Sequence, residues 1–238
     1  RDIGVAAAIG ADRVTVAAVP RVGIISTGNE VVPVTATPGP GEVRDANSYL
    51  AGAFVTERGC RPVYFGIVRD EREALKAAVS SALDTCDVVL VSGGSSKDER
   101  DNTAAVVADL GEVLVHGVAL APGKPTIIGT ARGRPVIGLP GHPASTFVVL
   151  VAIVDHLLAA MRGTAVSRRT LSARLKQNIP STRGREDYVR VSVRDGEAVP
   201  IFGKSGLLNT LVQSDGIVRV PASSEGLEVG EEVEVILW

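Results

Sequence analysis

Short apolar runs alternate with longer amphipathic segments along the first 165 residues of the chain. The apolar and β-branched runs are typical of buried strands, and they predict strands at Arg21–Thr27, Arg61–Val68, Val88–Val91 and Gly111–Ala119, and a hairpin of Thr126–Gly129 with Pro135–Ile137. The segments between them predict helices at Asn47–Arg58, Glu71–Leu83, Asn102–Leu110 and Ala144–Met161. Because such repetition implies right-handed crossovers, we expect an α/β fold with a mainly parallel open sheet and helices on both faces.

The pattern changes after Gly163, where short alternating segments are separated by turns. These segments predict strands at Leu171–Leu175, Asp187–Val193, Ala198–Ile201, Ile217–Pro221 and Glu232–Leu237. Short strands at this spacing favour a small β barrel or sandwich. We therefore expect an α/β domain over residues 21–165 and an all-β domain over residues 166–238, preceded over residues 1–20 by a linker or the remnant of missing N-terminal domains.

The helix predicted at Ala144–Met161 is apolar all round between Phe147 and Val154. Asp155 and His156 interrupt the apolar run, and the helix looks too short to cross a bilayer. We expect it to be buried in the core, with no membrane partner.

Composition and charge narrow the function. The formal net charge of −2 offers no basic face for nucleic acid, so an anionic ligand must be held by local Lys, Arg and backbone N–H groups. Cys60 and Cys86 form neither a metal-ligand pattern nor a disulfide framework, and we expect a cytoplasmic protein without a signal peptide. The first residue is Arg1 rather than Met, from which we expect a fragment of a longer chain.

A glycine- and serine-rich loop follows the strand predicted at Val88–Val91 and consists of Ser92, Gly93, Gly94, Ser95 and Ser96. Paired glycines let backbone N–H groups approach a ligand closely. Asp101 follows at the position where it can start the next helix. Because open α/β sheets bind ligands at the carboxyl ends of their strands, this loop is a candidate anion site, although an ordinary loop has the same composition.

Three carboxylates, those of Glu30, Asp70 and Asp101, come just after three different predicted strands. In a parallel sheet these positions share one edge, where gathered acids oppose ionisation unless a cation offsets them. One or two carboxylates plus substrate phosphates usually hold Mg²⁺, so we expect a Mg²⁺-assisted phosphate reaction here. The alternative is that each acid is a solvated loop residue or a helix cap.

Further anion-binding candidates lie in two segments. Lys124 stands between Gly123 and Pro125, which fix its backbone and suit it to an oxyanion. The segment Pro140–Ser145 opens the long helix, whose free N–H groups favour an anion, and within it His142 is either a ligand contact or a cap. In the second domain Arg185, Arg190 and Ser205 can reach over the cleft between domains or be solvated.

These motifs together resemble the MoeA/gephyrin E-domain family of molybdopterin molybdenumtransferases. The motifs stand in the order of that family and are Ser26-Thr27-Gly28-Asn29-Glu30, Ser92-Gly93-Gly94-Ser95-Ser96 with Asp101, Pro122-Gly123-Lys124-Pro125 and Gly138-Leu139-Pro140-Gly141-His142-Pro143. Gly203-Lys204-Ser205-Gly206 through Asp215-Gly216 resembles the small C-terminal β domain of the family. The resemblance covers residues 20–238 and is specific as a combination.

The resemblance implies a Rossmann-like molybdopterin-binding domain and an enzyme that inserts molybdenum (or tungsten) from molybdate or tungstate into adenylylated molybdopterin, with Mg²⁺-dependent release of AMP. By motif, Glu30, Asp70 and Asp101 match the essential acids of the family, and Lys124 and Ser145 match its oxyanion-binding positions. The predicted substrate contacts are Thr27, Gly28, Asn47, Ser92, Gly93, Gly94, Ser95, Ser96, Pro125, Pro140, Gly141, His142, Pro143, Ser145, Arg185, Arg190 and Ser205.

This sequence departs from the family pattern at four positions. Ala121 stands where the family often has Lys, Asp98 where it usually has Gly, His142 where it commonly has Asn, and Asn29 where it often has Asp. The resemblance also implies a homodimer in which N-terminal domains help to close the cleft of the partner subunit.

Two other functions stay open from the sequence. The adenylyltransferase that acts one step earlier shares the glycine loop and its acid, but it lacks a C-terminal β domain. A non-catalytic scaffold or a pterin- or molybdate-binding module is favoured by Ala121 and Asp98.

Overall fold

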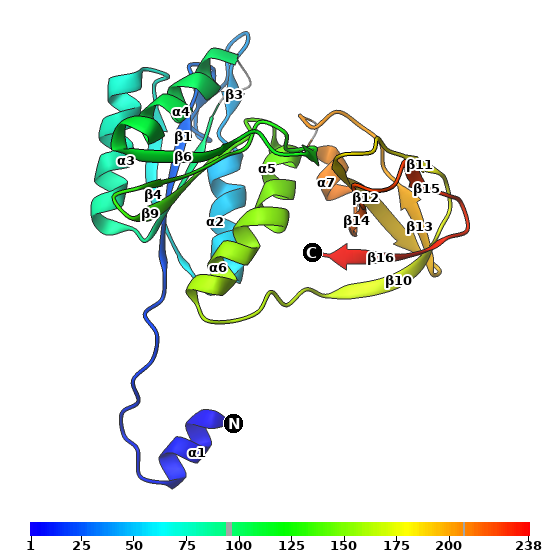
Figure 1. Cartoon of the computed structure of the whole chain (residues 1–238), viewed down its shortest axis with the longest axis horizontal. Coiled ribbons are helices and arrows are strands. Elements are labelled where there is room, and N and C mark those ends of the chain that lie inside the picture. Colours follow the sequence, from blue (N-terminus) through cyan, green and yellow to red (C-terminus); the bar gives the residue numbers. More distant parts are fainter. Residues whose placement is uncertain (94–96, 207) are drawn as a thin grey trace.

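The computed structural model describes residues 1–93, 97–206 and 208–238, and of residues 97–101 it describes the backbone alone. Figure 1 shows an α/β half, a smaller β half beside it, and an N-terminal segment that extends away from both. The predicted fold class, a mainly parallel α/β sheet followed by a small β barrel, is confirmed.

A six-stranded sheet in the order β4-β1-β5-β9-β8-β6 forms the centre of the α/β half. Its strands are β1 (Arg21–Thr27), β4 (Arg61–Val68), β5 (Val88–Ser92), β6 (Gly111–His116), β8 (Ile127–Ala131) and β9 (Arg134–Leu139). β4, β1, β5 and β9 pair in parallel, whereas β8 is antiparallel to both β9 and β6. Every residue of β5 is buried, as its apolar run predicts, and the four parallel strands end at one common edge.

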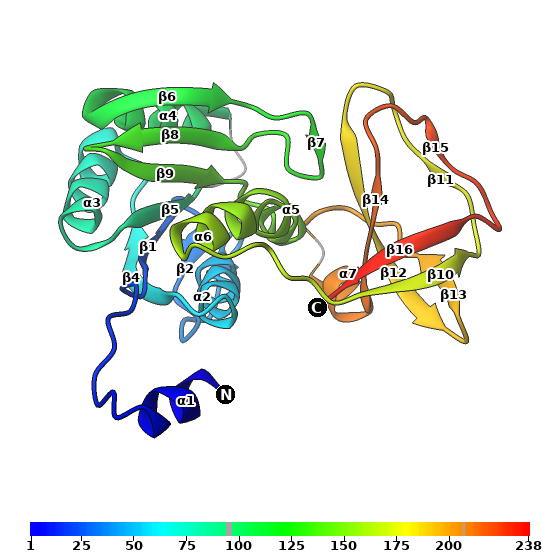
Figure 2. The same ribbon diagram turned by 60° about the horizontal axis from the view of Figure 1, so that its bottom comes forward.

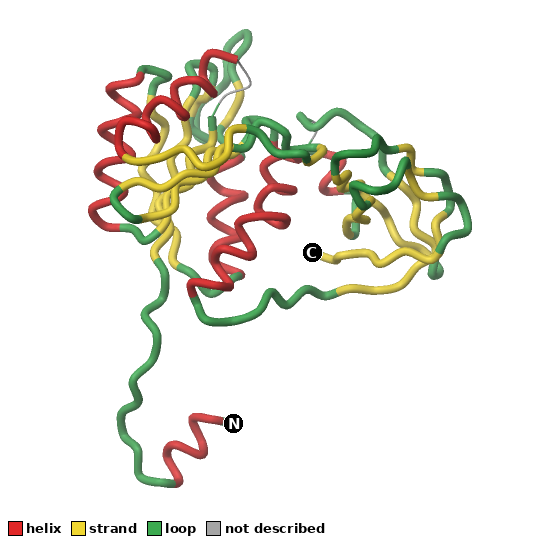
Figure 3. Tube along the Cα trace, viewed as in Figure 1, coloured by secondary structure: helices red, strands yellow, loops and turns green. Residues whose placement is uncertain are grey.

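Helices cover both faces of this sheet (Figure 3). They are α2 (Asn47–Glu57), α3 (Arg72–Thr85), α4 (Lys97–Leu110) and one long helix made of α5 (Pro143–Val149), the π-helical turn η1 (Leu150–Val154) and α6 (Asp155–Met161). Ile24 and Leu90 face α2 and the long helix, while Ile25 and Val91 face α3 and α4. Successive side chains of a strand point to opposite faces, so each central strand contributes to both layers of the core.

The start of α4 differs from the prediction. The helix begins at Lys97, five residues before Asn102, so Asp101 lies inside α4 and the expectation that it starts the helix is wrong. The first turns of α4 are almost entirely polar, and a boundary chosen from apolar periodicity is therefore placed too late.

The long helix Pro143–Met161 has 19 residues and a mean hydropathy of 2.0, which is enough by length and composition to cross a membrane. By length and composition, the expectation that this helix is too short to cross a bilayer is therefore wrong. However, 61% of its apolar window is buried inside the fold, where Val148, Leu150 and Leu158 are fully enclosed. The helix is thus a core element of the α/β half, as expected.

The C-terminal half is a closed β barrel. Its strands are β10 (Thr170–Leu175), β12 (Glu186–Arg194), β13 (Glu197–Pro200), β14 (Gly216–Val220) and β16 (Glu232–Leu237). The order β13-β10-β16-β14-β12 closes because β12 also pairs with β13, which decides between the predicted barrel and sandwich. Short accessory elements are β11 (Ile179–Pro180), β15 (Gly226–Leu227) and α7 (Asn209–Val212).

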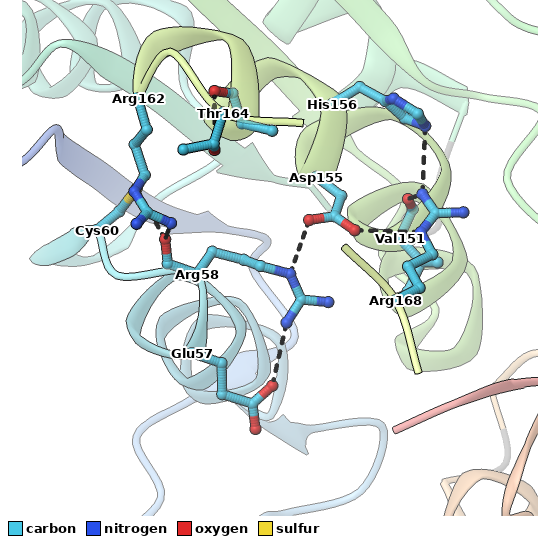
Figure 4. Close-up of polar contacts among 10 residues, drawn as sticks. Glu57, Arg58, Cys60, Val151, Asp155, His156, Arg162, Thr164 and Arg168 are labelled. Atoms are coloured by element: carbon cyan, nitrogen blue, oxygen red, sulfur yellow. Dashed lines mark hydrogen bonds and ion pairs between the residues drawn. The ribbon is translucent and has the colours of Figure 1, made fainter. Parts of the chain in front are cut away.

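The two halves are joined by more than the connecting chain. β7 (Leu120–Ala121) leaves the α/β half and pairs in parallel with β12 of the barrel (Figure 2). Figure 4 shows how the connecting chain itself is fixed to the α/β half, by the buried carboxylate of Asp155 between two guanidinium groups. Asp155 accepts hydrogen bonds from Arg58 at the end of α2 (2.7 Å) and from Arg168 in the interdomain linker (3.3 Å). The barrel is therefore held in a defined position beside the sheet.

The first nineteen residues stand apart from both halves. α1 (Asp2–Ala8) and the segment after it carry exposed apolar side chains, including Ile3, Val5 and Ile9 (Figure 1). A two-residue parallel pair, β2 (Val31–Val32) with β3 (Val43–Arg44), follows β1. This pair brings the start of α2 back toward the edge where β1 ends.

Candidate functional site

A cavity of about 580 Å³ lies where the parallel strands end. Its lining comes from the ends of β1 and β5, the start of α2, the turn before α5 and a loop of the barrel. The polar lining residues are Ser26, Thr27, Glu30, Arg44, Asp45, Asn47, Ser92 and His142. We call this space the edge cavity. Its position agrees with the rule that ligands of open α/β sheets bind at the carboxyl ends of strands.

Asn47 ties together two sides of the edge cavity. Its side-chain amide donates to Ser92 Oγ (2.9 Å) at the end of β5 and to the Gly141 carbonyl (2.8 Å) before α5. Asn47 Oδ1 and Thr27 Oγ1 are buried and have no hydrogen-bond partner within the described part of the chain. Buried polar atoms are nearly always paired, so unpaired atoms here mark a place where water or ligand completes the network.

Glu30 lines the edge cavity, and Gly28 makes room for its carboxylate. Gly28 has φ +141°, and a Cβ there would lie 2.8 Å from Glu30 Oε2. A larger residue would have to displace this carboxylate and would also strain the backbone. Gly28 thus provides space for the Glu30 carboxylate. Its predicted role as a substrate contact stays a prediction.

Asp70 lies at the same edge and connects the neighbouring loops. Its backbone N–H donates to Asn29 Oδ1 (3.4 Å), and Asn102 Nδ2 donates to its carboxylate (3.0 Å). Asn29 precedes Glu30, and Asn102 follows Asp101 in α4. The backbones that carry the three predicted acids are thus brought together at one edge.

The three-acid metal site itself stays a prediction. Among the described side chains, no three His, Cys, Asp or Glu groups lie close enough to hold a metal ion. The side chain of Asp101 lies outside the described residues, as do Gly94, Ser95 and Ser96 of the glycine-rich loop. Asp101 can therefore be assigned to α4 but not to a ligand set.

A smaller cavity of about 290 Å³ adjoins the edge cavity. It is lined by residues of the predicted oxyanion motif, the α5 turn and the barrel, among them Ala121, Lys124, Pro125, Pro140, Ser145 and Ser205. We call it the lysine cavity. Gly141 and His142 line both cavities, so the two spaces adjoin at the start of α5.

The barrel reaches the start of α5 through Ser205. The Ala144 N–H donates to the Ser205 carbonyl (3.1 Å), and Ser205 Oγ lies 3.1 Å from His142 Nδ1. The expectation that the helix leaves its N–H groups free is thus wrong for Ala144, because a carbonyl of the other half uses that donor. His142 is the N-cap residue of α5 by backbone position, with its side chain turned to Ser205 and making no cap hydrogen bond there.

Neither of the two predicted arginines lines the edge cavity or the lysine cavity. Arg190 is 6% exposed, and its Nη2 donates to the Gly203 carbonyl (3.1 Å), two residues before Ser205. Its Nε has no partner in the described structure, and burial lowers the pKa of the Arg190 guanidinium. Arg185 pairs instead with Asp187 (3.3 Å). Arg190 is therefore placed to support the loop that carries Ser205.

Sequence reasoning missed two polar residues of the edge cavity, Arg44 and Asp45. Both precede the helix start at Asn47, where an Asp is a common capping residue, and this was the available signal. Gly93 and Pro143, which were predicted, also line the edge cavity.

The fold and the two adjoining cavities define a two-domain protein with a ligand site at the carboxyl ends of parallel strands, completed by a loop of a β barrel. A model described as a probable molybdopterin-binding domain matches residues 23–160, and the MoeA C-terminal region (domain IV) matches residues 172–238. The chain therefore belongs to the MoeA family.

Individual relatives agree with this family. Molybdopterin molybdenumtransferase 1 of Mycobacterium tuberculosis is 33% identical over 98% of this chain and 58% of its own length. The solved structure of the molybdopterin biosynthesis MoeA protein of Pyrococcus horikoshii is 40% identical with a TM-score of 0.87, over 98% of this chain and 58% of that one. A molybdenum cofactor biosynthesis protein of Pyrococcus furiosus gives a TM-score of 0.77 at 31% identity, over 100% of this chain and 74% of that one. The chain spans little more than half the length of the curated relatives it matches.

Proposed function

We propose that this chain carries the substrate site of a molybdopterin molybdenumtransferase, which inserts molybdenum from molybdate into adenylylated molybdopterin and releases AMP. Tungstate has the same shape and charge as molybdate and is an alternative oxyanion for the same site. The observation that supports this function is the pair of adjoining cavities that share Gly141 and His142. The edge cavity suits the large nucleotide-bearing substrate, and the lysine cavity suits a small oxyanion beside it.

Lys124 supplies the charge for the oxyanion. Gly123 has φ +132°, and a Cβ there would lie 3.0 Å from both Leu120 Cδ2 and Val149 Cγ2, so glycine is needed for this turn. The Lys124 carbonyl accepts from the Val118 N–H (2.9 Å). The fixed backbone keeps Lys124 in the wall of the lysine cavity, so no backbone freedom of this turn has to be lost when an oxyanion binds.

Ser145 and Ser205 line the same cavity from the two halves of the protein. The Ser145 hydroxyl can donate to an oxyanion oxygen. Ser205 Oγ can do the same in the tautomer in which His142 Nδ1 carries the proton and donates to Ser205 Oγ. The barrel therefore contributes a donor as well as a wall. The supporting contact of Arg190 with Gly203 holds this donor in place.

The acids at the sheet edge fit Mg²⁺ in donor type. Glu30 and Asp70 provide hard carboxylate oxygens from two neighbouring loops, and substrate phosphates would complete the coordination, with Asp101 as the third expected acid. When bound, Mg²⁺ would neutralise charge on the phosphate linkage that is broken as AMP leaves. Gly28 keeps the Glu30 carboxylate directed at the cavity.

The complete protein is proposed to be a cytoplasmic homodimer. The relatives are longer than this chain, and the exposed apolar side chains of the first twenty residues are a surface that further protein could cover. Full activity is therefore expected from the longer protein.

Two other functions are weighed against this one. The adenylyltransferase is disfavoured because residues 172–238 match the MoeA C-terminal region. A non-catalytic binding module is favoured by Ala121, which lines the lysine cavity and leaves one positive charge fewer there than the family often has.

The test is release of AMP from adenylylated molybdopterin by the full-length protein, with molybdate and Mg²⁺. Release that requires molybdate is expected. Tight binding without release would support the binding module, and adenylylation of bare molybdopterin by ATP would support the adenylyltransferase. Lys124→Ala in the same assay separates binding of the pterin substrate from the molybdate-dependent reaction. It removes charge from the lysine cavity, proposed for the oxyanion, while the edge cavity stays intact.

A further inference from the structure

Asp45 is a buried carboxylate at the edge cavity to which no role has been assigned above. It lies just before α2, is 7% exposed, and lines the cavity beside Asn47. Burying a charged carboxylate is unfavourable unless its oxygens are hydrogen-bonded. The contacts that offset this burial therefore indicate what Asp45 does.

Both oxygens of Asp45 are used by the protein. Oδ2 accepts from Ser26 Oγ (2.7 Å) at the end of β1, and Oδ1 accepts from the Ser48 N–H (3.1 Å) in the first turn of α2. Its own N–H donates to the Val32 carbonyl (2.9 Å). Asp45 thus connects the end of β1, the β2–β3 pair and the start of α2.

These contacts reach the ligand space through Asn47. Asn47 shares the first turn of α2 with Ser48, and its amide bridges Ser92 and Gly141, which both line the edge cavity. A helix start held by Asp45 presents the Asn47 amide in one position. The distance between the end of β5 and the turn before α5 then depends on Asp45. Asp45 acts through Asn47, because it contacts neither Ser92 nor Gly141 itself.

We propose that Asp45 is a positioning residue that sets the shape of the edge cavity by fixing the first turn of α2, and with it the Asn47 bridge. It differs from Glu30, whose carboxylate is proposed for Mg²⁺, because both Asp45 oxygens are already engaged. The effect on substrate rests on the proposed function. The effect on the Asn47 bridge does not.

Asp45→Ala removes both side-chain contacts and is compared with Asp87→Ala. Asp87 is a matched control, since its Oδ2 accepts from the Arg21 N–H (2.8 Å) at the opposite end of the same strand, β1. In the full-length protein, we expect Asp45→Ala to raise the KM for adenylylated molybdopterin about tenfold, with kcat changed less than about threefold. Asp87→Ala should leave both values unchanged.

Hydrogen exchange gives a readout that needs no substrate. In Asp45→Ala, amides at residues 92–93 and 141–142 should exchange faster, and in Asp87→Ala they should not. If the wild-type protein releases no AMP but this exchange pattern holds, the proposed function fails and the role of Asp45 stands. Equal exchange at these amides in both variants would overturn the proposal.

Two further variants test whether Asp45 acts through Asn47. Asp45→Asn keeps an acceptor for the Ser48 N–H and an amide that can donate to Ser26 Oγ, so it should restore near-normal KM and exchange even if Asp45→Ala folds poorly. Asp45→Ala combined with Asn47→Ala should weaken binding by much less than the product of the single effects. Independent effects, or failure of Asp45→Asn to restore the exchange pattern, would contradict the mechanism.

Discussion

The edge cavity and a second cavity between the two halves of the protein are nearly equal in volume, about 580 and 600 Å³. The second, which we call the apolar cavity, is lined largely by side chains of α2, α5, α7 and β16, including Leu50, Phe54, Phe147, Leu211 and Trp238. The edge cavity collects polar groups from four separate chain segments. Because the volumes are so similar, size does not single out a candidate ligand site here, whereas the convergence of polar groups from distant segments does.

α2 contributes to both cavities with different parts of its length. Its first turn places Asn47 at the edge cavity, where the Asn47 amide donates to Ser92 and to the Gly141 carbonyl. Later turns place Phe54 in the apolar cavity, where its ring lies edge-on to Phe147, which in turn lies edge-on to Trp238. One helix thus links a polar site at its N-terminal end to an apolar contact region further along. Changes at the edge cavity should affect chemistry, and changes around the apolar cavity should affect stability.

Asp101→Ala, a substitution at the edge of the sheet, is expected to have the largest effect, and this effect is on turnover. We expect turnover to fall by about 100-fold or more, because a proposed metal-binding carboxylate stabilises the transition state by several kcal/mol. The unfolding midpoint should stay close to that of the wild type. The assay is AMP release by the full-length protein, with urea unfolding alongside.

Asp109→Ala is the matched control for Asp101, since Asp109 lies in the same helix and pairs with Arg72 (2.7 Å) and Lys76 (3.1 Å). This variant should keep its turnover. Near-normal rates in Asp101→Ala would refute the assignment of that acid to Mg²⁺.

Lys124→Ala is expected to have the next largest effect. Loss of the ammonium group from the lysine cavity should lower kcat/KM for molybdate by about tenfold to 100-fold, since a charge-assisted hydrogen bond is lost. Rates of AMP release at increasing molybdate concentration measure this change. Lys76→Ala, which removes a lysine from α3, should have no such effect, and a similar loss in both variants would show that the lysine cavity is not the oxyanion site.

Asp155→Asn tests the region beside the apolar cavity. It removes the negative charge between Arg58 and Arg168, whose side chains are 28% and 17% exposed, and leaves two partly buried cations close together. We expect a loss of about 2 kcal/mol in the free energy of unfolding, less than for a fully buried pair because both arginines reach solvent. Urea unfolding measures the loss.

Asp84→Asn is the comparison for Asp155, because the Asp84–Arg132 pair lies at the surface with side chains 67% and 48% exposed. Its cost should be below about 1 kcal/mol. If the two substitutions cost the same, the Asp155 link contributes no more than an ordinary surface pair.

The smallest expected effect comes from Trp238→Phe. This change removes the hydrogen bond from Trp238 Nε1 to the Ser214 carbonyl (2.9 Å) but keeps an aromatic ring against Phe147. We expect a loss of about 1 kcal/mol in stability and an unchanged KM for adenylylated molybdopterin.

Trp238 also reports on the apolar cavity directly, because it is the single tryptophan of the chain. Substrate that binds in the edge cavity should leave its fluorescence emission nearly constant. A large shift in emission on substrate binding would show that the two cavities are coupled, and the separation drawn above would then not hold.

The order of elements, the two halves and the motifs at the strand ends could all be read from the sequence. Strands such as β4 and helices such as α3 follow from local apolar periodicity, which depends only on neighbouring residues. The same local signals placed Glu30, Asp70 and Lys124 after strands or in a tight turn. They also identified the MoeA resemblance, because its motifs are short and contiguous.

Only the tertiary structure shows the contacts between segments that are distant in sequence. The Ser205 carbonyl reaching Ala144, the Asn47 amide between Ser92 and Gly141, and the Asp45 contact with Ser26 each join residues far apart in sequence. A residue type and its neighbours specify which groups can hydrogen-bond, but not which distant partner comes within hydrogen-bonding distance. That choice follows from the parallel pairing of the strands and the docking of the barrel, because these set the distances between loops.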